Sequence, residues 1–245
     1  MKIKDLIKHY SEILSISDEN IGFKNTEDIK QAKLGYDEYY DYWIIYFRKD
    51  CRRFPIIHEL GHIYLAKKKF NYLGFAKPPP ITPQTDKNLI YILSNLIDCF
   101  VNYNLSIIEP IYLEIQEYFH DYLTDLESIK NRIKSINNIL LILSFYFLYY
   151  IEFKFILKEE DRFMLQENMN NLLNALRNNC IKRDDRLDLN KFEIINKILD
   201  KFDSFKTSNN YEEVLNFFLQ VLKSTSFWGS DYLNNQFNLI FSETI

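Results

Sequence analysis

Glycine and proline are scarce in this chain, and their scarcity limits the folds open to it. Five glycines and six prolines occur in 245 residues, and three of the prolines are consecutive, Pro78-Pro79-Pro80. Both residue types end helices or form turns, so a chain with few of them favours helices joined by short connections. This length suffices for one large domain or two small ones. We therefore expect a fold dominated by helices.

The sequence changes character at about residue 20. Residues 1–16 place apolar side chains at helical spacing, which predicts an amphipathic helix. Residues 20–50 instead hold short runs of β-branched and aromatic residues separated by Asn, Asp and Gly, which predicts a small sheet of two to four strands. The most aromatic run, Tyr39 to Arg48, is expected to form an edge along which an extended peptide can lie.

Two helices are predicted after this sheet. Proline is tolerated in a first helical turn, so one helix is expected from Pro55 to about Phe70. The run from Pro78 to Pro80 forms a rigid connection, because each proline fixes φ and removes a donor. A second, largely apolar helix is expected from Thr85, a good capping residue, to about Leu105.

The rest of the chain, after residue 109, is predicted to form about five further helices. The expected breaks lie near residues 178–185, 207–210 and 229. The expected fold class is thus α+β and predominantly α-helical. Its units are an N-terminal unit over 1–105, with the small sheet, and an all-helical portion over 106–245. The two can also pack as one domain.

Charge and cysteine content narrow the function classes. A net charge of −4 and a pI near 5.7 give no electrostatic reason to expect a nucleic-acid partner. Three cysteines without CxxC spacing indicate a reducing compartment and no disulfide framework. The N-terminal segment lacks the continuous apolar core of a signal peptide. A cytoplasmic protein is expected.

One segment offers a different interpretation. Residues 135–151 carry no charge over 17 residues, which is the lower limit for a membrane span. Two asparagines and three tyrosines in this segment favour a buried central helix over a membrane-associated one. A membrane-bound enzyme anchored by this segment is the less favoured alternative.

The stretch "RRFPIIHELGHIYLA" carries the clearest chemistry. His58 and His62 are four residues apart on a predicted helix, so both imidazoles can reach one ion. Zinc accepts two imidazoles from one helical turn, and a catalytic site adds a third protein ligand and a water. Glu59 lies on the same helix, where it can take the proton of a zinc-bound water without ligating the metal.

The third ligand is expected on the next helix, within "SNLIDCFVN". Asn95, Asp98 and Asn102 fall at i, i+3 and i+7 of an otherwise apolar helix. A carboxylate there is costly unless it is paired or binds a metal, so Asp98 is the favoured third ligand. Asn95 and Asn102 would then hold Asp98 or its neighbours in place. The alternative is that this polar stripe simply faces solvent. The weaker candidates for the third ligand are Asp86, Glu109, Glu114 and His120.

These motifs resemble the active-site helix of zincin-type zinc metallopeptidases. They are most similar to the intracellular group that includes the phage-repressor-cleaving ImmA/IrrE-like enzymes, in which a short aromatic strand also precedes H-E-L-G-H. That group takes its third ligand from a glutamate, whereas "SNLIDCFVN" resembles another set of proposed metallopeptidases with an aspartate in its place. The likeness covers residues 40–105 and implies a minimal zincin fold and peptide-bond hydrolysis.

We therefore expect a zinc-dependent metallopeptidase, an endopeptidase rather than an exopeptidase, that acts on a peptide or protein substrate. His58, His62 and Asp98 would bind zinc, and Glu59 would activate the water; other transition metals also suit this ligand set. The alternative is a non-catalytic helical interaction protein with a structural or vestigial zinc site. Structural zinc sites usually have four protein ligands, often cysteines, which argues against that alternative.

Overall fold

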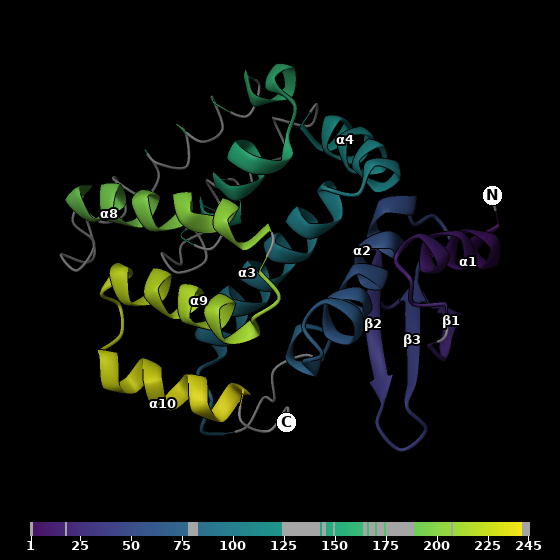
Figure 1. The fold of residues 1–245 in the computed structure, drawn as a ribbon, viewed down its shortest axis with the longest axis horizontal. Coiled ribbons are helices and arrows are strands. Elements are labelled where there is room, and N and C mark those ends of the chain that lie inside the picture. Colours follow the sequence, from purple (N-terminus) through teal and green to yellow (C-terminus); the bar gives the residue numbers. More distant parts are fainter. Residues whose placement is uncertain are drawn as a thin grey trace. The chain divides into compact units, whose positions relative to one another are not determined.

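The computed structural model describes residues 2–17, 19–77, 83–123, 143, 146–148, 150–163, 166, 170, 174, 189–206 and 208–241. The fold is predominantly helical with one three-stranded sheet, which confirms the predicted α+β class. In chain order its elements are α1 (Ile3–Ile13), β1 (Ile21–Asn25), β2 (Ala32–Asp37), β3 (Tyr42–Phe47), α2 (Arg53–Tyr64), η1 (Leu65–Lys69), η2 (Leu73–Phe75), α3 (Lys87–Ser106), α4 (Glu109–Leu123), η3 (Glu152–Ile156), α8 (Leu189–Leu199), η4 (Asp200–Lys206), α9 (Tyr211–Thr225) and α10 (Ser230–Phe241) (Figure 1).

The described chain divides into two compact units. The first takes in Met1–Pro78 and Asn104–Tyr118, and the second takes in Pro79–Tyr103 and Phe119–Glu243. The division falls inside α3 and inside α4, each of which is one continuous helix. The functional division of the chain into 1–105 and 106–245 stays a prediction.

The sheet of the first unit has the order β1-β3-β2, with β1 parallel and β2 antiparallel to β3. The expectation that the aromatic run forms an edge is wrong, because β3 is the central strand and β2 is an edge. Trp43, Ile45 and Phe47 of β3 are buried on one face. Pairing with β1 and β2 engages the backbone groups on both sides of this strand.

Helix α2 covers the buried face of the sheet (Figure 1). Its apolar residues, among them Ile56, Leu60 and Ile63, are fully buried. The helix begins at Arg53, so Pro55 lies in the first turn, where backbone N–H groups have no helical partner to lose. A π-helical turn, η1, continues α2 to Lys69, close to the predicted end of the helix.

The second unit is built around aromatic side chains of α3, η4 and α9. The ring of Phe100 contacts those of Phe202 and Phe218, with centroids 5.6 and 6.2 Å apart. The hydroxyl of buried Tyr103 donates to the Asp203 carboxylate at 2.8 Å. Buried aromatics thus supply the apolar contacts that hold these three elements together.

The predicted helix breaks are confirmed where the structure describes them. Helix α9 begins five residues after η4 ends at Lys206, and α10 begins at Ser230 after a break that includes Gly229. The break near residues 178–185 and most of the segment 135–151 lie outside the described residues. Among the helices that are described, none has the length and apolar character needed to cross a membrane.

Asp86 begins α3 and also holds α10. Its carboxylate accepts the backbone N–H groups of Asn88 and Leu89, and its other oxygen accepts the indole N–H of Trp228 at 3.0 Å. Replacing Asp86 with alanine removes the cap and this bond, so we expect the free energy of unfolding to fall by about 2 kcal/mol. Chemical denaturation measures this change. The exposed Asp231, replaced with alanine, should change it by no more than about 0.5 kcal/mol.

Candidate metal centre

His58 and His62 lie one turn apart on α2, and both are half-buried. Their Nε2 atoms are 3.2 Å apart, so the two rings direct the same atom toward one point. Two nitrogens that share a tetrahedral zinc ion at about 2.0–2.1 Å are separated by about 3.3 Å. The spacing of the two imidazoles therefore suits a single ion.

The ring orientation of His62 is fixed from behind by the backbone. Its Nδ1–H donates to the carbonyl oxygen of Phe75 at 2.5 Å. That bond places the proton on Nδ1, so the neutral ring offers the lone pair of Nε2 to a metal. This contact could not be predicted from side-chain identity, because every residue carries a backbone carbonyl.

The turn that places the Phe75 carbonyl is held by aromatic packing. The rings of Phe70 and Tyr72 contact that of Phe75, with centroids 4.9 and 5.8 Å apart, and all three residues are buried. Gly74 leaves room for this cluster, since a Cβ there would lie 2.4 Å from Cε1 of Tyr72. The cluster thus sets the position of the group that orients His62.

Replacing Gly74 with alanine is expected to weaken zinc binding about tenfold, because the added Cβ shifts Tyr72 and with it the Phe75 carbonyl. Competition with a chromophoric chelator measures the zinc affinity. The matched control is Gly229→Ala, where a Cβ meets nothing within 4 Å. Equal zinc affinities of the two variants would show that the aromatic turn does not orient His62.

Glu59 lies beside His58 on α2 and is half-buried. One oxygen of its carboxylate accepts the backbone N–H of Leu34 at 2.9 Å. Leu34 belongs to β2, and alternate N–H groups of an edge strand point away from the sheet. Glu59 is therefore held at the edge of the sheet, beside His58 on α2, by a contact that could not be foreseen from the sequence.

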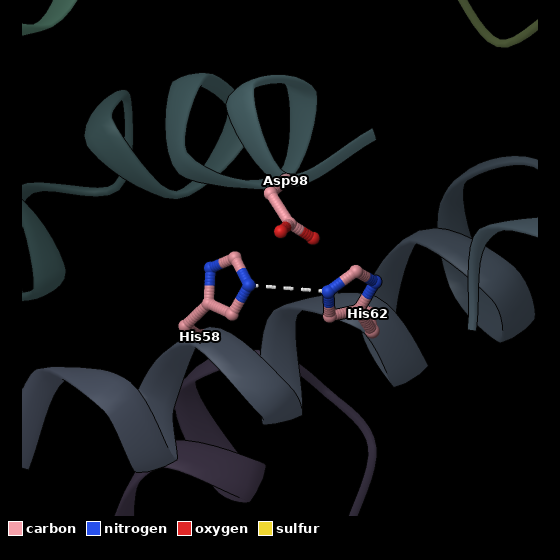
Figure 2. Close-up of side chains that lie close together, drawn as sticks. All are labelled: His58, His62 and Asp98. Carbon is pink, nitrogen blue, oxygen red and sulfur yellow. Dashed lines mark hydrogen bonds between the residues drawn. The ribbon is translucent and has the colours of Figure 1, made fainter. Parts of the chain in front are cut away.

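Asp98 comes from α3. One ligand atom each from His58, His62 and Asp98 lies within 4.8 Å of the other two, and the group could hold a metal ion (Figure 2). Asn102 is buried, and Asn95 and Asp98 are half-buried, so the polar stripe of α3 is not an open solvent-facing surface. That Asn95 and Asn102 hold the site in place stays a prediction.

The weaker candidates for the third metal ligand have other contacts or an exposed position in the structure. Asp86 caps α3, and Glu109 is exposed at the start of α4. Glu114 accepts hydrogen bonds from Tyr10 and Arg53 at 2.9 and 3.3 Å, and His120 contacts Asp161 at 3.0 Å.

Cys51 lies near Glu59. Burial, together with the negative charges of Asp50 and Glu59, raises the pKa of its thiol to about 11.

The ligand chemistry of this group suits zinc and also other divalent transition metals, because two imidazoles and a carboxylate are ligands common to them. Comparison of the chain with models of known families, with curated proteins and with solved structures finds no match. The metal centre is therefore inferred from the geometry of its own side chains.

Proposed function

We propose that this protein is a zinc-dependent endopeptidase. His58, His62 and Asp98 hold the ion, and Glu59 is the general base. The observation that carries the proposal is the orientation of His62: its Nδ1–H is donated to Phe75, and its Nε2 faces that of His58 at 3.2 Å. Metal-ligating histidines commonly donate their other ring N–H to a backbone carbonyl or a carboxylate, as His62 does to Phe75.

The place of Asp98 in the site is supported by the end of its helix. The last residues of α3, from Asn104, belong to the same unit as α2. The side chain of Asn104 accepts a hydrogen bond from Lys69, whose burial lowers the pKa of its ammonium to about 8. Asp98 precedes Asn104 by six residues, which is about 9 Å along a helix axis. The contact between Lys69 and Asn104 therefore holds α3 at a point about 9 Å from Asp98.

The proposed chemistry is hydrolysis of a peptide bond. When bound, zinc supplies a Lewis acid that polarises the substrate carbonyl and lowers the pKa of water. Glu59 takes a proton from the attacking water and gives it to the leaving amine nitrogen as the C–N bond breaks. The Leu34 N–H holds one oxygen of Glu59 and leaves the other for this transfer.

The edge of β2 supports a substrate in extended conformation. The Leu34 N–H bonds Glu59 and not β3, and backbone groups alternate in direction along a strand, so those of Ala32 and Tyr36 also point away from the sheet. An added strand can pair with the backbone groups of Ala32 and Tyr36, and it then passes the carboxylate that the Leu34 N–H holds. A folded loop would not present its backbone to this edge.

Digestion of an unfolded protein tests the proposal. The zinc-loaded protein is incubated with reduced and carboxymethylated casein, and new peptide ends are identified by mass spectrometry. We expect internal cleavage that stops when a chelator removes the metal and resumes when zinc is restored. A protein that retains zinc and cleaves nothing would contradict the proposal and favour the interaction protein with a structural zinc site.

A further inference from the structure

A groove of about 640 Å³ extends along the edge strand β2. Its lining includes residues that precede the strand, residues of the strand itself, Glu38 just after it, Tyr46 of β3 and Lys77. The charged residues of the lining are Asp28, Lys33, Glu38 and Lys77. The backbone N–H of Leu34, another lining residue, is the group that holds Glu59. A chain lying in this groove therefore passes the residue that holds the proposed general base.

The outer face of the sheet, opposite α2, has a distinctive pattern of two glycines and two tyrosines. Gly22 of β1 and Gly35 of β2 both pair with Ile44 of the central strand. Tyr42 lies over Gly22, and Tyr46 lies over Gly35, where a Cβ would be 2.9 Å from Cε2 of the ring. Tyr46 and Gly35 line the groove, whereas Tyr42 lies over the opposite edge strand.

We propose that Gly35 and Tyr46 form the subsite that selects an aromatic or large aliphatic side chain of the extended substrate; this inference rests on the proposed function. Side chains of paired strands alternate between faces, so the substrate residue opposite Gly35 projects on the outer face. Because Gly35 has no side chain, the ring of Tyr46 lies over it, and the substrate side chain can pack against that ring.

The charges of the groove agree with an apolar side chain at this point. Glu38 and Lys77 form an ion pair at 2.6 Å beyond the end of β2, and Lys33 lies toward the start of the strand. Between them, Gly35 and the ring of Tyr46 form an uncharged surface, and Lys33 is the cross-strand partner of Tyr46. An apolar side chain packs on this ring without losing hydrogen bonds to water, which a polar amide side chain would lose.

Peptide binding tests the subsite without requiring cleavage. The probes are fluorescein-labelled octapeptides of alternating serine and valine, with phenylalanine, leucine, alanine or glutamine at one central position. Their affinity for the zinc-loaded Glu59→Gln protein is measured by fluorescence anisotropy. We expect the phenylalanine and leucine peptides to bind about tenfold more tightly than the alanine peptide, and the glutamine peptide to bind no better than alanine.

Two variants and a matched control test whether Gly35 and Tyr46 cause this preference. Tyr46→Ser removes the ring, and Gly35→Ala displaces it, because the added Cβ would lie 2.9 Å from Cε2 of the ring. Each variant should therefore bind the phenylalanine and leucine peptides only as tightly as the alanine peptide. Tyr42→Ser removes the equivalent ring over Gly22 and should leave all affinities unchanged. Equal binding of the four peptides by the parent protein, or the same effect from Tyr42→Ser as from Tyr46→Ser, would overturn the subsite.

The outcomes separate this inference from the peptidase proposal. Binding that depends on Tyr46, in a protein whose zinc-loaded wild type cleaves nothing, supports the subsite and contradicts the peptidase. Cleavage by the wild type with the same residue preference in wild type and Tyr46→Ser supports the peptidase and contradicts the subsite.

Discussion

Replacing Glu59 with glutamine is expected to lower the rate of peptide hydrolysis about a thousandfold, because the amide cannot take a proton from water. The zinc content should not change. The amide oxygen of glutamine can still accept the Leu34 N–H, so the bond that holds this side chain is retained. Cleavage of carboxymethylated casein and elemental analysis of the same sample measure the two quantities.

The control for this variant is Glu109→Gln, which makes the same chemical change at an exposed position on α4. It should leave both the rate and the zinc content unchanged. Hydrolysis that survives in Glu59→Gln at the wild-type rate would show that another group activates the water. Loss of zinc in this variant would instead make Glu59 a ligand.

Replacing His62 or Asp98 with alanine is expected to weaken zinc binding by at least about a hundredfold. Loss of an outer contact alone costs about 10–100-fold in metal affinity, and loss of a ligand costs more. Elemental analysis after dialysis against a weak chelator should find about one zinc per wild-type chain and almost none in either variant. Activity should fall with the metal.

His120→Ala is the control for these ligand variants, because His120 contacts Asp161 and not the histidine pair. Zinc that is retained without Asp98 but lost without His62 would confirm the histidine pair and assign the third ligand to another residue. Wild-type protein that takes up no zinc on reconstitution would refute the metal centre and, with it, the peptidase.

The histidine pair could be predicted from the sequence because its geometry is local. Residues four apart on any helix share a face, and the run from Phe54 to Tyr64 is helical in the structure. Asp98 could be proposed because a carboxylate in an apolar helix requires an explanation. Both inferences used only residues within one predicted helix.

The strand order and the backbone contacts could not be predicted in this way. That β3 is central depends on which distant segments pair with it, and its own aromatic pattern suits a central or an edge strand. The Phe75 carbonyl and the Leu34 N–H are groups that every residue has, so side-chain identity carries no information about them. Both contacts join segments that come together only in the folded chain.

The Phe75 carbonyl behind the ring of His62 also affects how a metal ion would bind. The Phe75 contact and the aromatic turn fix the tautomer and rotamer of His62 during folding, so that ordering has already occurred when zinc arrives. Small zinc domains differ, because there the free energy of metal binding stabilises the fold itself. We therefore expect the protein to keep its fold without a metal, and zinc to bind to it reversibly.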